Sequence, residues 1–265
     1  ALTILKLAEE SKLALSDPIS KYVKGVPNGD AITIEALLNH TSGLFSVNED
    51  LKVRRRDEPL TFSESLAILR KHGAMFCPGE NWRYTNSGYW LLGHVLEVLE
   101  ERPVDEVISA VVLEPLGLQN IRVLKPADAA SDVATLYSSD PKVNAMRPGS
   151  AGAAGPMAAS SEAVVRLWHA VLSAKLVKPA TLERMFEELY PMFGNSPYYG
   201  LGVMLYVVPQ PDGNMKLWLG HSGGAPGVKA MFAYSPSDNV FVAVALSGDG
   251  SAEATANLLI NALAD

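Results

Sequence analysis

The sequence of 265 residues has a single cysteine, Cys77, and therefore no internal disulfide. No group of histidine, cysteine and acidic residues has the spacing of a zinc site, and there is no glycine-rich phosphate loop, so we expect neither a metal nor a cofactor. No apolar run reaches the ~20 residues that a transmembrane helix needs. These absences direct the search towards chemistry carried by ordinary side chains.

Positive charge is also scarce. The net charge is −7, and no basic patch with interleaved aromatic residues occurs, so we expect no nucleic acid as a partner. Hydrophobic residues make up 48% of the chain and charged residues 19%, which is typical of a globular protein with a substantial core. The composition fits one large domain or two closely joined lobes, and it leaves the oligomeric state open.

The spacing of apolar residues predicts helices first and strands last. We expect helices over residues 1–15, 34–40, 62–72, 87–101, 104–113, 161–174, 179–188 and 252–264. We expect a short extended run at 30–34, loop structure at 120–157, and strands over 199–208, 215–219, 228–234 and 240–246. A helical middle followed by an antiparallel meander and a packing helix predicts an α+β protein.

Two details of the N-terminal helices can be predicted. Apolar residues occupy nearly every position of 1–8, which indicates a helix buried on all sides. Thr33 is placed to cap the helix that starts after it. Gly43, within His40-Thr41-Ser42-Gly43-Leu44, is expected to end that helix.

The most informative features are two short motifs. Tyr84-Thr85-Asn86 follows the turn Pro78-Gly79 and precedes an apolar helix, whereas His221-Ser222-Gly223 lies between two strand-like runs. On an extended backbone the side chains of residues i and i+2 point the same way. Tyr84 and Asn86 can therefore face one cleft.

In order, separation and flanking sequence, the two motifs resemble the serine β-lactamase and penicillin-binding-protein superfamily, specifically its class C-like branch of esterases, D-peptidases and β-lactamases. The resemblance implies an antiparallel sheet flanked by helices, built from both ends of the chain, with a mostly helical lobe inserted. Residues 1–30 and 190–265 would then form the sheet lobe and 31–189 the helical lobe, with the active site in the cleft between them.

The family's first motif, Ser-x-x-Lys, carries the nucleophile, and we expect it to be absent from the chain. Residues 13–22 resemble the family's sequence just after the nucleophile helix, which places the serine about seven residues upstream of Ala1. We therefore expect a fragment of a longer protein, inactive and poorly stable by itself. The alternative is the natural N-terminus of a protein without that serine.

The resemblance implies a role for each motif residue. A tyrosine with a pKa near ~10 is a poor base, but the lysine of the missing motif would favour the phenolate and make Tyr84 the general base. Asn86 would orient that lysine and bind the acyl part of the substrate. The backbone N–H near Gly224 would contribute to an oxyanion hole, and Ser222 and Gly223 would line the substrate site.

The resemblance makes His221 a catalytic-site residue that positions reacting groups, at a place where many relatives have lysine. Because histidine is mostly neutral above a pH of about 6.5, a penicillinase that binds the β-lactam carboxylate is disfavoured. The implied reaction is acyl transfer to water from a small ester, amide or D-amino-acid peptide. An alternative of another class is a non-catalytic module that binds peptides or peptidoglycan.

A rival motif overlaps the second one. Residues 220–224 fit the G-x-S-x-G nucleophile elbow of α/β-hydrolases, with Ser222 as nucleophile. That fold needs a helix after the serine and a histidine further on. No histidine follows His221, and residues 228–234 predict a strand, so we reject this reading.

The other candidates are weaker. The resemblance makes His40 a structural support close to the site, whereas three histidines on predicted helices are expected to be surface or packing residues: His72, His94 and His169. Four aromatic residues are expected in the core, although they could line the cleft: Trp82, Trp90, Tyr198 and Tyr199. The resemblance favours a bacterial periplasmic or secreted protein, and the sequence leaves a cytoplasmic one open.

Overall fold

The computed structural model describes residues 1–54, 60–125, 133–140, 151–155, 157–192, 194, 196–210 and 213–264. Its helices are α1 Leu2–Glu9, α2 Ile34–Leu38, α3 Leu51–Arg54, α4 Phe62–His72, α5 Asn86–Glu100, α6 Val104–Ile108, α7 Ser161–Leu172, α8 Pro179–Arg184 and α9 Ala252–Ala264. Its strands are β1 Ile121–Val123, β2 Met157–Ala159, β3 Tyr190–Pro191, β4 Tyr198–Tyr199, β5 Met204–Pro209, β6 Met215–Ala225, β7 Val228–Ser235 and β8 Val240–Leu246.

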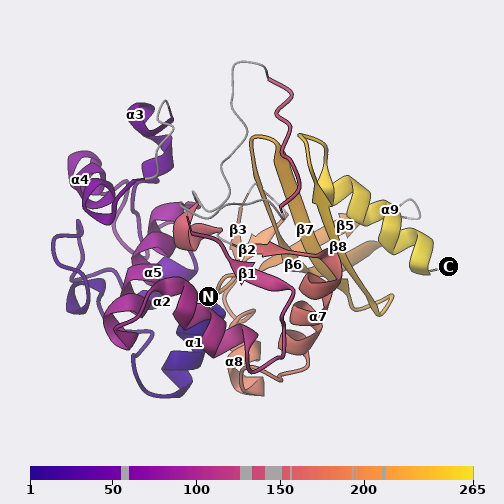
Figure 1. Ribbon diagram of the computed structural model, residues 1–265, viewed down its shortest axis with the longest axis horizontal. Coiled ribbons are helices and arrows are strands. Elements are labelled where there is room, and N and C mark those ends of the chain that lie inside the picture. The colour runs from indigo at the N-terminus through magenta and orange to yellow at the C-terminus, as the bar shows by residue number, and fades with distance from the viewer. Residues whose placement is uncertain are drawn as a thin grey trace.

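Strands β3 to β8 form one antiparallel sheet in which neighbours in sequence are neighbours in space. Helix α9 covers one face, where Ala256 and Ile260 pack with Met231 of β7. Helix α7 covers the other, because Trp168 packs against Phe232, the next residue along β7. Helices α1 to α5 lie on the opposite side of the sheet from α9 (Figure 1). The α+β prediction is confirmed, and the assignment of residues 1–30 to the sheet lobe stays a prediction.

Helix α1 is buried, as the sequence predicts: Ile4, Leu5 and Leu7 are each at most 1% exposed. The predicted extent of 1–15 is wrong, because α1 ends at Glu9. The backbone then turns at Ser11, which has a positive φ of 58°, and this conformation cannot continue a right-handed helix.

Helix α2 begins as predicted, since the Thr33 hydroxyl accepts the Ala36 N–H at 3.0 Å. Its predicted end is wrong. The left-handed residue after the helix is His40, with a φ of 65°, and the Thr41 N–H donates to the Ala36 carbonyl at 3.0 Å. Gly43 instead allows two backbone segments to approach closely, since a Cβ there would lie 2.2 Å from the Phe76 carbonyl oxygen.

Several predicted boundaries also change in the strand region. Strand β6 runs to Ala225, so the His221 motif lies within a strand and not in a loop. The predicted strand 199–208 divides into β4 and β5 at residues 200–203, where a Cβ on Gly200 would lie 2.1 Å from the Met185 carbonyl oxygen.

Three other expectations need correction. The predicted loop 120–157 contains strand β1, which pairs with β2 at and just beyond the end of that loop. Residues 126–132, 141–150 and 156 of the loop lie outside the described residues. The extended run at 30–34 is a single bridge between Thr33 and Pro18, and helix α8 ends at Arg184. Within the described segments, none of the helices is long and apolar enough to cross a membrane.

The tight pairing of β6 with β7 gives a test of the fold. A Cβ on Gly220 would lie 1.9 Å from the Phe232 carbonyl oxygen, whereas a Cβ on Gly223 would meet nothing within 4 Å. Gly220→Ala should lower the free energy of unfolding by about 3 kcal/mol, because backbone must move to admit the methyl group. Gly223→Ala, the matched control, should change it by less than about 0.5 kcal/mol. Urea unfolding of both variants measures this, and equal effects would contradict the pairing.

Candidate active site

The two motifs meet in a group of six rings that we call the aromatic cluster: His40, Trp82, Tyr84, Tyr89, Tyr199 and His221. Tyr199 links them. Its ring centroid lies 5.8 Å from that of Tyr84 and 5.6 Å from that of His221, and its hydroxyl is 3.1 Å from His221 Nε2. The fold therefore brings together two residues that are 137 positions apart in the sequence, Tyr84 and His221.

The Tyr84 segment is held at the start of α5. Thr85, not Asn86, is the N-cap, since its side chain accepts the Ser87 N–H at 3.2 Å. The Asn86 N–H donates to Ser46 Oγ at 3.2 Å, and the Asn86 side chain makes no hydrogen bond with the described residues. The amide of Asn86 is thus available beside Tyr84, whose burial raises the pKa of the phenol.

The tautomer of His221 follows from its partners. Nδ1 lies 2.7 Å from the Ser222 carbonyl oxygen, which can only accept, so the proton is on Nδ1. Nε2 is then an acceptor and takes the Tyr199 O–H. Burial lowers the pKa of His221 to about 4, against the effect of the Ser222 bond, and the ring is neutral near neutral pH.

Strand β6 offers an open edge beside this ring. Its pairing with β5 stops at Gly220, whereas its pairing with β7 continues to Ala225. Because two-residue hairpins close on a hydrogen-bonded pair and N–H directions alternate, the Ser222 and Gly224 N–H groups point to the open side. Burial raises the pKa of Tyr206 of β5, and hydrogen bonds from the Ser222 side chain and backbone N–H to the Tyr206 hydroxyl lower it. The Ser222 N–H therefore points towards β5, away from β7.

Gly224 is exposed and lies opposite Lys229 of β7. A Cβ on Gly224 would lie 2.6 Å from Lys229 Cδ and 3.1 Å from Lys229 Nζ, so the flexible lysine side chain passes close to it. The edge amide of Gly224 is thus accessible, with an ammonium group close by. Such an N–H is suited to stabilise developing negative charge on a carbonyl oxygen.

Ser222 lacks the surroundings of a nucleophile elbow. Strand β6 passes through a turn into strand β7, not into a helix, and His221 directs its nitrogens at Tyr199 and at a backbone carbonyl. Ser222 thus has no base from the histidine next to it, which argues against the α/β-hydrolase alternative.

The chain does contain one Ser-x-x-Lys spacing, at Ser139 and Lys142, so the reading that this pattern is wholly missing is wrong. Ser139 lies in a bend outside any helix, and its hydroxyl is bonded to Asp249 Oδ2 at 2.8 Å. Lys142 lies outside the described residues. In the family motif the serine and lysine share one face of a helix, a geometry that Ser139 does not offer.

Tyr199 lies in the core, as the sequence predicts, and is only 1% exposed, but its hydroxyl also bonds to His221. The sequence indicates this role in Tyr199-Gly200-Leu201-Gly202, because closely spaced glycines mark close backbone approaches.

The other histidines are packing residues as predicted: His72 stacks on Phe45, His94 on Phe62, and His169 packs against Phe241. Trp90 donates to the Ala151 carbonyl, and Tyr198 pairs in β4.

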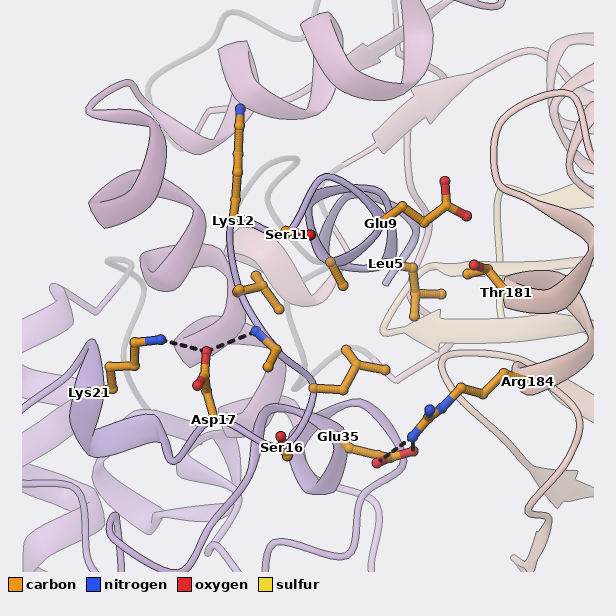
Figure 2. A pocket seen from close by; sticks show the side chains of 14 residues that line it. Leu5, Glu9, Ser11, Lys12, Ser16, Asp17, Lys21, Glu35, Thr181 and Arg184 are labelled. Carbon is orange, nitrogen blue, oxygen red and sulfur yellow. Dashed lines mark hydrogen bonds and ion pairs between the residues drawn. The ribbon is translucent and has the colours of Figure 1, made fainter.

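A surface groove of about 800 Å³ lies apart from the aromatic cluster, along α1 and the turn after it (Figure 2). Its charged side chains are already paired: Lys21 with Asp17 at 2.8 Å, and Arg184 with Glu35 at 2.9 Å. Lys12 likewise bonds to Glu100 at 2.7 Å. In the part of the chain that the structure describes, no group of three histidine, cysteine or acidic residues could hold a metal ion.

The family model described as Beta-lactamase matches residues 1–265. The chain belongs to this family. The Bacillus subtilis protein PbpX is 27% identical over 251 residues, covering 91% of the chain, and penicillin-binding protein 4* of the same organism is 27% identical over 257 residues, covering 87%. The chain spans only 58% and 54% of the length of these two relatives.

Solved structures agree with this family. A D-stereospecific amidohydrolase from Streptomyces superposes with a TM-score of 0.84 at 26% identity, over 96% of this chain and 80% of that one. A penicillin-binding protein from Bacillus halodurans has a TM-score of 0.81 at 25% identity, over 99% and 81%. The fold is thus that of the serine hydrolases of the β-lactamase family.

The buried histidines predict how stability depends on pH. Burial lowers the pKa of His40 to about 3 and that of His221 to about 4, whereas both are near 6.5 in an unfolded chain. As the pH falls below about 6.5, the unfolded chain gains protons that the folded chain does not, so stability falls. The free energy of unfolding should drop by up to about 1.4 kcal/mol per pH unit for each histidine, until the pH nears 4.

Urea unfolding at pH 7, 6 and 5 measures this loss. In residues 1–265, His221→Asn should reduce the pH dependence without removing it, because His40 and the buried amino group of Ala1, whose pKa is lowered to about 5, remain. Gly223→Ala, which neither adds nor removes a titratable group, should leave the pH dependence intact. A free energy of unfolding that is the same at pH 7 and pH 5 would show that these rings are not held neutral.

Proposed function

We propose that the full-length protein is a serine hydrolase that forms an acyl-enzyme on a small ester, an amide or a D-amino-acid peptide. The observation that carries the proposal is the meeting of Tyr84 and His221 around Tyr199, beside the open edge of β6. The likeness to a D-stereospecific amidohydrolase supports the class of substrate.

The nucleophilic serine and its lysine, in this proposal, belong to residues that precede Ala1 in the full-length protein. The start of α1 lies beside the aromatic cluster: a Cβ on Gly202 would be 2.3 Å from Ala1 Cβ and 2.9 Å from the Tyr89 hydroxyl. Residues placed before α1 would therefore lie close to the aromatic cluster that contains Tyr84.

The proposed reaction begins with proton transfer. The lysine of the upstream Ser-x-x-Lys motif lowers the pKa of Tyr84. The phenolate then takes the serine proton as Oγ attacks the carbonyl carbon. The oxyanion is held by the Gly224 N–H and the backbone N–H of the serine. When the tetrahedral intermediate collapses, Tyr84 returns the proton to the leaving alcohol or amine. A water molecule, deprotonated by the same base, then attacks the acyl-enzyme, and Tyr84 returns this proton to the departing serine Oγ.

His221 bears on the choice of substrate. As a neutral ring it supplies no cation for a substrate carboxylate, and both of its nitrogens are engaged. An anionic group on the substrate would have to be bound by Lys229 instead, at Gly224. This arrangement favours uncharged esters and amides over substrates whose carboxylate must be held at the position of His221.

Substitution of the base tests the proposal. In the full-length protein, Tyr84→Phe should reduce kcat for p-nitrophenyl esters by about a hundredfold or more, the range for loss of a general base. Ser222→Ala, on the same edge of the cleft but without a base, should have a mild effect. The opposite ranking would revive the α/β-hydrolase reading, and the absence of any turnover in the unaltered protein would favour a binding module.

A further inference from the structure

His40 has an unusual backbone for its residue type. It is 0% exposed and adopts a φ of 65°, immediately after the C-cap of α2. At this position helices usually have glycine, because a Cβ is strained in the left-handed region. A buried residue with a Cβ that is kept in this strained conformation indicates a functional constraint and not only a contribution to stability.

The contacts of His40 centre on Tyr84. The His40 carbonyl accepts the Arg83 N–H at 3.1 Å, and His40 Nδ1 accepts the Thr85 N–H at 3.3 Å. The residues on both sides of Tyr84 are thus fixed by one histidine. The imidazole also lies against the tyrosine, with the two ring centroids 4.1 Å apart.

These bonds determine where the proton of His40 is. A backbone N–H can only donate, so Nδ1 is the acceptor and the neutral ring carries its proton on Nε2. Nε2 is buried and has no hydrogen-bond partner among the residues that the structure describes. A buried donor without a partner costs stability, so this ring is not placed for stability alone.

The titratable groups around His40 give it no reason to become charged. Besides Tyr84, the ring faces Tyr89 at 5.3 Å and Tyr199 at 4.5 Å between centroids. Burial is the main cause of its low pKa, and His221 lowers it further. Protonation of Nδ1 would also break the hydrogen bond from the Thr85 N–H. The neutral form of His40 is therefore needed to hold the backbone next to Tyr84.

We propose that His40 is a positioning residue for Tyr84: its neutral imidazole, protonated on Nε2, holds the Thr85 N–H and packs against the phenol ring, while its backbone carbonyl holds the Arg83 N–H on the other side of the catalytic tyrosine. The inference deepens the proposed function and rests on it for the role of Tyr84. Displacing a catalytic group by about 1 Å can cost up to a hundredfold in rate, so such support has a kinetic consequence.

Kinetics of the full-length protein test the positioning role. Asparagine tolerates a positive φ, so His40→Asn removes the ring without adding backbone strain. We expect kcat for a neutral p-nitrophenyl ester to fall by about tenfold or more, with KM changed by less than about threefold, in protein that is folded by circular dichroism. His94→Asn, the matched control, should change kcat by less than about twofold. Folded His40→Asn protein with an unchanged kcat would overturn the proposal.

The proton position is tested without any assay of activity. Long-range ¹H–¹⁵N spectra of the labelled protein should show His40 protonated on Nε2 and unprotonated on Nδ1 from pH 8 down to pH 5. His221 should show the opposite tautomer over the same range. If His40 titrates with an ordinary pKa near 6.5, or is protonated on Nδ1, the inference fails even if the protein is an active hydrolase. This measurement also decides the matter if His40→Asn does not fold, or if the full-length protein proves inactive.

Discussion

The hydrogen bond from the Tyr199 hydroxyl to His221 Nε2 is the interaction on which the site depends. Tyr199 is almost fully buried on β4, and its ring also packs against His40, 4.5 Å away. It therefore joins the sheet, which carries His221, to the helical part of the protein, which carries Tyr84. This buried ring thus connects the two motifs, which lie on different layers of the structure.

Burial also sets the charge of the site. Taking imidazole and phenol rings out of water disfavours their charged forms, which keeps His40 and His221 neutral and raises the pKa of Tyr84. A tyrosine in this state is a weak base. The proposed chemistry therefore needs a cation close to Tyr84, and in our proposal the lysine upstream of Ala1 supplies it. Electrostatic effects of such a cation are large in a buried site, because little water screens them.

Much of the fold was readable from the sequence, since regular elements with clear ends leave clear patterns. Helix α4 and strand β8 have the predicted bounds, and Thr33 caps α2. The predicted end of β6 was wrong because Gly220, Gly223 and Gly224 suggest a turn, whereas the structure uses the missing Cβ at Gly220 for close strand pairing. The contacts of His40 with Arg83 and Thr85, and the bond from Tyr199 to His221, span more than twenty positions, which periodicity does not report. The motifs predicted which residues to examine, and the fold supplied their partners.

The most direct test of the account is to map the serine that becomes acylated. The full-length protein is treated with a fluorescent penicillin and, separately, with a fluorophosphonate, and the labelled peptide is sequenced by mass spectrometry, with residues 1–265 treated in parallel. The account predicts a labelled serine upstream of Ala1, within Ser-x-x-Lys, and no labelling of residues 1–265 alone. A label on Ser222, Ser139 or any other serine of residues 1–265 would contradict it.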